Sequence, residues 1–134
     1  MKVGITFSTF DLLHAGHIEM LREAKEQCDY LICGLQVDPS LDRPEKNKPI
    51  QTLVERWVQL QAVKYVDEII PYDTEQSLRD LLMSTPIDIR FVGDDYKDRI
   101  FTGMDLGHEV FYTSRKHSFS SSSLRNKIHE SRTK

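Results

Sequence analysis

The sequence predicts an α/β fold: a single doubly wound, Rossmann-like domain with a five-stranded parallel sheet and helices on both faces. Strand-like and helix-like segments alternate along the 134 residues. The strand-like runs are continuously apolar, which is typical of parallel strands covered on both faces. The chain contains no internal repeat and no linker-like stretch, so we expect residues 1–134 to form one domain.

Five short apolar runs are the candidates for strands. The first reads KVGITF and the second YLICGLQV, and neither has a polar face. Apolar runs of this length, bounded by polar or turn-forming residues, are typical of buried strands. We expect strands over residues 2–7, 30–37, 66–71, 87–93 and 108–113.

Apolar residues at helical spacing mark the helices. Ile18 and Leu21 begin such a pattern after the first strand. Thr52 is a suitable N-cap for another helix, and either Asp73 or Thr74 for the next. We expect helices over residues 17–28, 52–65, 74–84 and 121–131.

Composition narrows the class of protein. A net charge of −3 gives no sign of the excess positive charge that is typical of nucleic-acid-binding proteins. No apolar run approaches the roughly 20 residues of a membrane span, and no signal-peptide pattern is present. We therefore expect a cytoplasmic protein without nucleic-acid or membrane partners. Cys28 and Cys33 form neither a CxxC motif nor a disulfide framework, and we expect free, buried thiols.

Polar stretches follow three of the expected strands. They read STFDLLHAGH after the first, GDDYKDR after the fourth and SRKHSFSSSSLR after the fifth. Ligands of doubly wound sheets bind beyond the carboxyl ends of the strands. We therefore expect these stretches to line one site.

His14 and His17 flank Gly16 where a helix should begin. Zinc binding would need at least a third protein ligand, and the HExxH pattern is absent. Packing is disfavoured because two histidines beside a glycine suit a site of close backbone approach. The free N–H groups of a helix start favour an anion. Phosphate binding is the preferred interpretation, and we expect no metal site built from protein side chains.

The order of strand, TFD, HAGH and helix resembles the signature of the HxGH nucleotidyltransferase superfamily. KYVDEIIP, GDD and SR…FSSSSLR follow in the order seen in its cytidylyltransferase family, above all in the glycerol-3-phosphate cytidylyltransferase subgroup. The resemblance implies that an acceptor phosphate attacks the α-phosphate of a nucleoside triphosphate and releases pyrophosphate. CMP would pass from CTP to a small alcohol or polyol phosphate, with glycerol 3-phosphate giving CDP-glycerol. Two alternatives are an adenylyltransferase using ATP and a sugar phosphate, and a nucleotide-binding regulatory domain without turnover.

The resemblance also implies roles for particular residues. The groups expected to act on the reacting phosphates are His14, His17, Lys46 and Arg115. The nucleotide would be bound by Thr9, Phe10, Gly16, Gly93, Asp94, Ser120, Ser121 and Ser122. The acceptor would be bound by Asp11, Lys48, Arg56 and Arg79, with Lys48 the substitute for Lys46. Mg²⁺ would accompany the triphosphate, and the protein would form a homodimer.

Three positions depart from the family pattern. Ser8 stands where relatives carry a glycine before TFD. A positive φ at Ser8 would be strained, whereas an extended backbone would tolerate serine. Lys116 and Ser118 replace a threonine and a glycine near the serine run.

Overall fold

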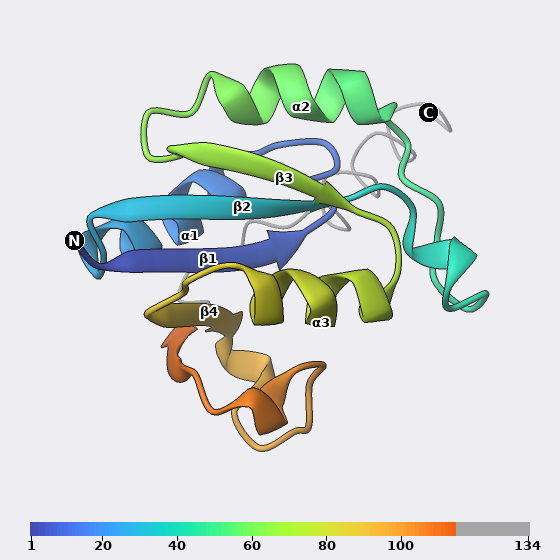
Figure 1. Ribbon diagram of the computed structural model, residues 1–134. Coiled ribbons are helices and arrows are strands. Elements are labelled where there is room, and N and C mark those ends of the chain that lie inside the picture. Colours follow the sequence, from blue (N-terminus) through green and yellow to red (C-terminus); the bar gives the residue numbers. More distant parts are fainter. Residues whose placement is uncertain (115–134) are drawn as a thin grey trace.

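The computed structural model describes residues 1–114, which contain a five-stranded parallel sheet and three α-helices (Figure 1). The strands are β1 (Val3–Ser8), β2 (Tyr30–Gln36), β3 (Glu68–Tyr72), β4 (Ile89–Gly93) and β5 (Glu109–Thr113). The helices are α1 (Ala15–Glu26), α2 (Leu53–Gln61) and α3 (Glu75–Ser84). Short 3₁₀ turns occur at η1 (Pro39–Leu41), η2 (Asp94–Tyr96) and η3 (Met104–Leu106). The predicted fold class is confirmed.

The strand order is β3-β2-β1-β4-β5, with every neighbouring pair parallel. β1 lies in the middle, where Ile5 is in register with Ile32 of β2 and with Arg90 of β4. The chain leaves β1 towards β2 and later returns to add β4 on the other side. The carboxyl ends of β1 and β4 therefore form the switch point at which such sheets bind ligands.

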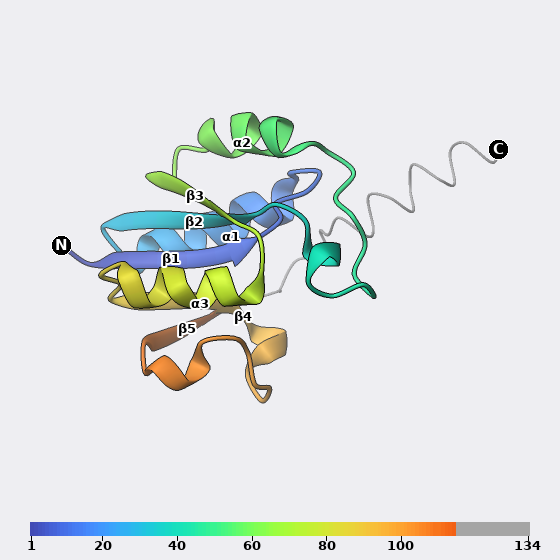
Figure 2. The ribbon, with the colours of Figure 1, turned by 45° about the vertical axis from the view of Figure 1, so that its right-hand side comes forward.

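Helices cover the two faces of the sheet separately. α1 and α2 pack on one face, and α3 packs on the other (Figures 1 and 2). Alternation along each strand sends side chains to both faces. The core under α1 and α2 includes Leu21, Ala24, Leu31, Leu35, Leu60 and Phe91. The core under α3 includes Ile5, Ile32, Leu78 and Leu82.

α2 is shorter than the apolar spacing predicts. The helix ends at Gln61 instead of residue 65. The N–H groups of Ala62 and Val63 donate to carbonyls three residues back, at 3.2 and 3.1 Å, which tightens the chain into a turn. Val63 still packs against the core from this turn. The apolar periodicity therefore continues past the last α-helical hydrogen bond.

Each α-helix begins at the residue directly after its N-cap. Thr52 and Thr74 each cap a helix through a reciprocal capping box, as the sequence predicts. α1 begins at Ala15, two residues before the expected start, because His14 is its N-cap. The expected helix at 121–131 lies outside the described residues.

Both cysteines are free. Cys33 is buried and Cys28 is half-buried. Burial raises the pKa of the Cys33 thiol.

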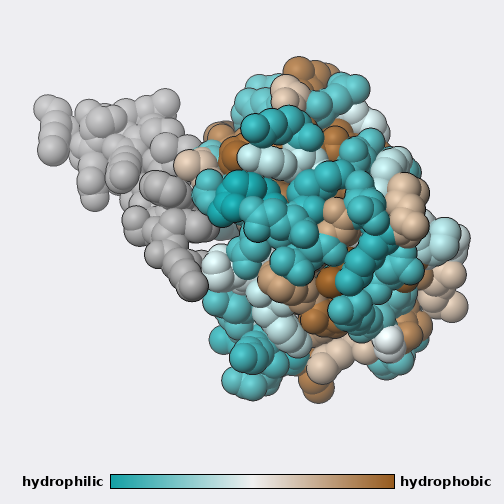
Figure 3. All heavy atoms as spheres, turned by 90° about the vertical axis from the view of Figure 1, so that its left-hand side faces the viewer, coloured by the Kyte–Doolittle hydropathy of each residue, from teal (hydrophilic) through white to brown (hydrophobic). Residues whose placement is uncertain are grey.

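Among the described residues, no helix has the length and apolar character needed to cross a bilayer. Figure 3 shows the edge of the sheet from which the strands start, where hydrophilic residues are interspersed with small apolar areas. The polar side chains of the candidate site lie at the opposite edge.

Candidate active site

A pocket of about 590 Å³ opens at the carboxyl edge of the sheet. The end of β1, the start of α1 and the ends of β4 and β5 line one part of it. The ends of β2 and β3 and the start of α3 line the rest. The residues that line the pocket include Phe7, Ser8, His14, Gly16, His17, Gln36, Arg43, Tyr72, Glu75, Arg90, Gly93, Phe101, Thr113 and Ser114.

The loop between β1 and α1 has an unusual backbone. Phe10 and Leu12 have φ angles of 49° and 51°, in the left-handed region, which costs roughly 1–2 kcal/mol for each residue with a side chain. The Phe10 ring is fully buried, and its N–H donates to Ser8 Oγ at 3.2 Å. Ser8 itself belongs to β1 and is not among the positive-φ residues, so serine is tolerated there.

Asp11 and Gln51 connect this loop to the segment before α2. The Asp11 carboxylate accepts the N–H groups of Ile50 and Gln51 at 2.8 and 3.0 Å. The Gln51 side chain makes a second contact with the same loop, because its Oε1 accepts the Leu12 N–H at 2.8 Å. Asp11 is buried. These contacts show how the structure uses the carboxylate to hold the loop.

Arg56 is the centre of a second set of contacts. All three guanidinium nitrogens donate to backbone carbonyls, those of Thr9 (3.0 Å), Gln36 (2.5 Å), Val37 (2.7 Å) and Gln51 (3.2 Å). The residue is only 2% exposed and does not line the pocket. The expected contact of Arg56 with the acceptor is therefore corrected: the side chain positions the loops around the site.

His14 and His17 satisfy the N–H groups at the start of α1. His14 Nδ1 accepts the Gly16 N–H at 2.9 Å, and His17 Nδ1 accepts the His14 N–H at 3.2 Å. The arrangement is a capping box built from two imidazoles, whose ring centroids lie 4.1 Å apart. A neutral imidazole has one donor and one acceptor nitrogen. The hydrogen-bond network therefore assigns the ring protons to Nε2 in both residues.

Burial keeps His17 neutral at neutral pH. Loss of hydration, helped by the neighbouring His14 and opposed by Asp11, lowers the pKa of His17 from 6.5 to about 4. The ring also packs against Phe10, with 5.8 Å between the centroids. The start of α1 therefore offers imidazole N–H donors beside the positive end of a helix dipole, an arrangement suited to a polyanion.

Four of the residues singled out from the sequence line the pocket: His14, Gly16, His17 and Gly93. Thr9, Phe10 and Asp11 belong to the loop between β1 and α1, which leads to His14, the N-cap of α1. Asp94 begins η2 and is exposed outside the pocket lining. Arg115, Ser120, Ser121 and Ser122 lie outside the described residues.

Three of the expected cations do not line the pocket, namely Lys46 for the reacting phosphates and Lys48 and Arg79 for the acceptor. Lys46 and Lys48 are exposed in the loop between η1 and α2 and do not line it. Arg79 also lies outside the lining and makes a bidentate ion pair with Asp105, with N–O distances of 2.7 and 2.8 Å. The expected contact of Arg79 with an acceptor phosphate stays a prediction. Within residues 1–114, no group of three or more His, Cys, Asp or Glu side chains is arranged to hold a metal.

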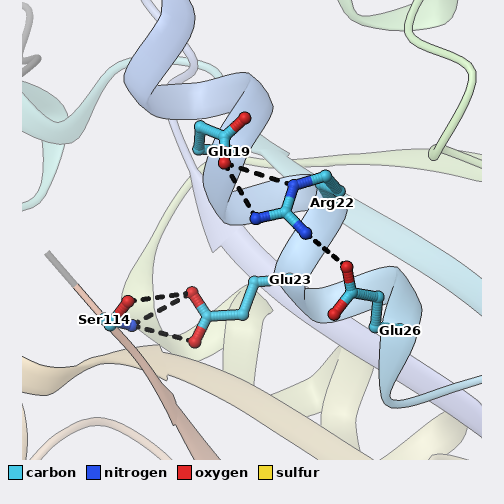
Figure 4. A network of polar contacts seen from close by, with 5 residues as sticks. All are labelled: Glu19, Arg22, Glu23, Glu26 and Ser114. Atoms are coloured by element: carbon cyan, nitrogen blue, oxygen red, sulfur yellow. Dashed lines mark hydrogen bonds and ion pairs between the residues drawn. The ribbon is translucent and has the colours of Figure 1, made fainter. Parts of the chain in front are cut away.

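Two groups of site residues were missed from the sequence. The Glu23 carboxylate accepts the N–H of Ser114 at 3.1 and 3.2 Å and its hydroxyl at 3.3 Å, which ties α1 to the end of β5 (Figure 4). The two residues are 91 positions apart, and no local pattern connects them. The second group comprises Gln36, Arg43, Tyr72 and Arg90 on the α3 side of the pocket. Its one sequence signal is Arg90, a charge inside the apolar run 87–93.

The parallel sheet, its switch-point pocket and the paired histidines at the start of α1 define an α/β nucleotidyltransferase. Residues 5–127 match the family model described as cytidylyltransferase-like. The chain belongs to this family, and the resemblance seen in the sequence is confirmed.

Curated relatives are similar in sequence over nearly the whole of this chain. Glycerol-3-phosphate cytidylyltransferase of Bacillus subtilis (strain 168) is 32% identical over 128 residues, covering 96% of this chain and 98% of the relative. The protein of that name from Staphylococcus aureus (strain NCTC 8325 / PS 47) is 32% identical over 129 residues, covering 96% of each chain. The bifunctional protein HldE of Campylobacter jejuni (serotype O:6) is 34% identical over 128 residues, 95% of this chain, which spans only 28% of that relative's length.

Solved structures share the fold at lower identity. A lipopolysaccharide core biosynthesis protein from Thermoplasma volcanium has a TM-score of 0.62 and 23% identity, covering 97% of this chain and 88% of its own. Pantothenate synthetase from Thermus thermophilus has a TM-score of 0.64 and 14% identity, covering 94% and 64%.

Replacement of Arg56 by lysine should destabilise the protein strongly. One ammonium group cannot reach four carbonyls in different loops, so buried carbonyls lose their partners. We expect the free energy of unfolding in urea to fall by about 2–4 kcal/mol. Arg22→Lys on the surface of α1 is the control and should behave like the wild type, because its partners Glu19 and Glu26 are solvent-exposed (Figure 4). Equal stability of the two variants would contradict the assigned role.

His17 should make the stability depend on pH. Its pKa is lower in the folded state, so its contribution is complete above pH 6.5 and is lost as the pH falls towards 4. Glutamine at this position can still accept the His14 N–H but does not titrate. Between pH 7 and 4, we expect the wild type to lose about 2–3 kcal/mol more stability than His17→Gln. Parallel pH curves of unfolding free energy for the two proteins would show that His17 is not held neutral.

Proposed function

We propose that this protein transfers CMP from CTP to the phosphate of a small alcohol or polyol, with glycerol 3-phosphate as the acceptor. CDP-glycerol and pyrophosphate would be the products. The observation that carries the proposal is the histidine pair, which lines the pocket at the start of α1 and whose Nδ1 atoms accept backbone N–H groups, so that the ring protons lie on Nε2. Two nearly full-length relatives named glycerol-3-phosphate cytidylyltransferase support the choice of donor and acceptor.

The chemistry is an in-line displacement at the α-phosphorus. An oxygen of the acceptor phosphate forms the new bond, and the bond from the α-phosphorus to the oxygen bridging to the β-phosphorus breaks. Pyrophosphate leaves with that electron pair. Negative charge grows on the leaving group, and fixed N–H donors stabilise it without reorganising. A neutral imidazole can donate a hydrogen bond from Nε2 to the leaving group without transferring its proton.

Further cations belong to the proposal. Lys46, with Lys48 as its substitute, and Arg115 would contribute positive charge, and Ser120, Ser121 and Ser122 would bind the terminal phosphates. Mg²⁺ would enter with the triphosphate and neutralise part of its charge. The described part of the pocket lining is compatible with a metal that arrives bound to the phosphates, because its one carboxylate, Glu75, is paired with Arg43 and its other oxygen ligands include the hydroxyls of Ser8 and Thr113. A metal at this site would therefore be held mainly by phosphate oxygens. A homodimer and a cytoplasmic location stay predictions.

Pyrophosphate release tests the reaction directly. CTP and ATP, each with Mg²⁺, are crossed with glycerol 3-phosphate, phosphocholine, phosphoethanolamine and a sugar-phosphate mixture. We expect release with CTP and glycerol 3-phosphate. Release with ATP alone would replace the proposed donor. Release with CTP and another acceptor would replace glycerol 3-phosphate, and no release from a folded, nucleotide-binding protein would favour the regulatory alternative.

His14→Asn separates catalysis from helix capping in the same assay. Asparagine is a good N-cap, so the start of α1 should remain folded, but the imidazole Nε2 donor is lost. Removing one preorganised donor of this kind lowers kcat by roughly 10²–10³-fold. Wild-type turnover in a variant with wild-type stability would contradict the role given to His14.

A further inference from the structure

Polar side chains on the α3 side of the pocket include three buried nitrogens, on Gln36, Arg43 and Arg90, that have no hydrogen-bond partner among the described residues. We define the arginine cluster as Gln36, Arg43, Tyr72 and Arg90, all of which line the pocket. We propose that the arginine cluster binds the phosphate group of the acceptor, an inference that rests on the proposed transfer reaction. Arg90 is its principal anion-binding side chain.

Arg90 is a buried cation that has no carboxylate partner among the described residues. Its neighbours in β4, Ile89 and Phe91, belong to the core under α1 and α2. Alternation along the strand sends Arg90 to the α3 face. Only 6% of the residue is exposed. Within residues 1–114, Arg90 makes no ion pair, and its Nε has no hydrogen-bond partner.

Two aromatic rings hold the Arg90 guanidinium in place. Its Cζ lies 5.2 Å from the centroid of Phe7 and 4.9 Å from that of Phe101. One terminal nitrogen donates to the Thr102 carbonyl. Gly34 makes room for the Phe7 ring, because a Cβ at that position would lie 2.3 Å from Phe7 Cδ1. The guanidinium is therefore fixed before any ligand arrives, which is the condition for strong binding.

The charged side chains that line the described part of the pocket carry a net positive charge. Glu75 is the carboxylate of the described pocket lining, and it forms an ion pair with Arg43. Arg43, Arg90 and Glu75 together carry a net charge of +1. A buried, uncompensated charge is costly in free energy. An anionic ligand would remove that cost.

Other unpartnered donors face the same part of the pocket. Gln36 is 7% exposed, and its Nε2 has no hydrogen-bond partner among the described residues. Arg43 Nε is buried and likewise unpartnered there. Two guanidinium groups and an amide are typical donors to phosphate oxygens. Their number matches a ligand with several acceptor oxygens.

The position of the cluster distinguishes the acceptor from the triphosphate. His14 and His17 lie at the start of α1, on the opposite face of the sheet from α3, and both groups border one pocket. In an in-line transfer the attacking and leaving oxygens lie on opposite sides of the α-phosphorus. With the leaving pyrophosphate on the α1 side, the attacking phosphate approaches from the α3 side, where the arginine cluster lies.

Binding to a nucleotide-filled protein tests the proposal without turnover. The intact chain is saturated with Mg²⁺ and α,β-methylene CTP, which cannot transfer CMP, and is titrated with glycerol 3-phosphate. Glycerol serves as the uncharged comparison and inorganic phosphate as the minimal anion. In Arg90→Met, an unbranched apolar side chain fills the space between the two rings. We expect the Kd for glycerol 3-phosphate to rise roughly 10- to 100-fold, the range for a lost hydrogen bond to a charged group.

The controls give each outcome one meaning. Arg22→Met removes a surface arginine from α1 and should bind all ligands as the wild type does. In Arg90→Met, the Kd of the CTP analogue should change less than about threefold. If Arg90→Met proves unstable, Gln36→Met serves as the second variant. It should weaken glycerol 3-phosphate binding while leaving the fold intact. Three results would overturn the proposal. The first is unchanged acceptor binding in these variants, and the second is an equal loss of CTP-analogue binding. The third is a wild type that binds neither phosphate probe. Arg90-dependent phosphate binding without pyrophosphate release in the wild type would support the subsite and refute the proposed reaction.

Discussion

One buried guanidinium organises the carboxyl edge of the sheet. Arg56, on α2, donates to the carbonyls of Thr9 after β1, of Gln36 and Val37 at the end of β2, and of Gln51 before α2. Buried carbonyls need hydrogen-bond donors, and the Arg56 guanidinium supplies donors to all four. The same contact that completes the backbone hydrogen bonding also fixes where the loop after β1 can run. The position of the pocket depends on this constraint.

Each imidazole of the histidine pair has two roles, one for each ring nitrogen. Nδ1 satisfies a backbone N–H at the start of α1, which sets the ring orientation and leaves the proton on Nε2. Burial then keeps His17 neutral. The two sides of the pocket therefore differ in their electrostatics: hydrogen-bond donors at a helix N-terminus on the α1 side, and the uncompensated charge of Arg90 on the α3 side. A reaction that joins two phosphate-bearing substrates needs two such anion sites.

The fold and the histidines were predictable because their signals are local. Continuous apolar runs mark the strands, and HAGH lies within one turn of a helix start. Contacts between distant residues were not predictable. Arg56 meets carbonyls up to 47 positions away, and Arg79 pairs with Asp105, 26 positions along the chain. Arg90 is visible in the sequence as a charge in a strand, but the ring of Phe101 and its place in the pocket depend on how the sheet assembles.

Long-range ¹H–¹⁵N correlation spectra of the histidine side chains test the central claim most directly. At pH 7 the account predicts neutral rings protonated on Nε2 for His14 and His17, with His17 titrating near pH 4. Adding CTP and Mg²⁺ should shift both Nε2 resonances. An Nδ1-protonated tautomer or an imidazolium at His17 at pH 7 would contradict the capping arrangement, and unchanged Nε2 resonances in the saturated complex would show that the pair does not contact the nucleotide.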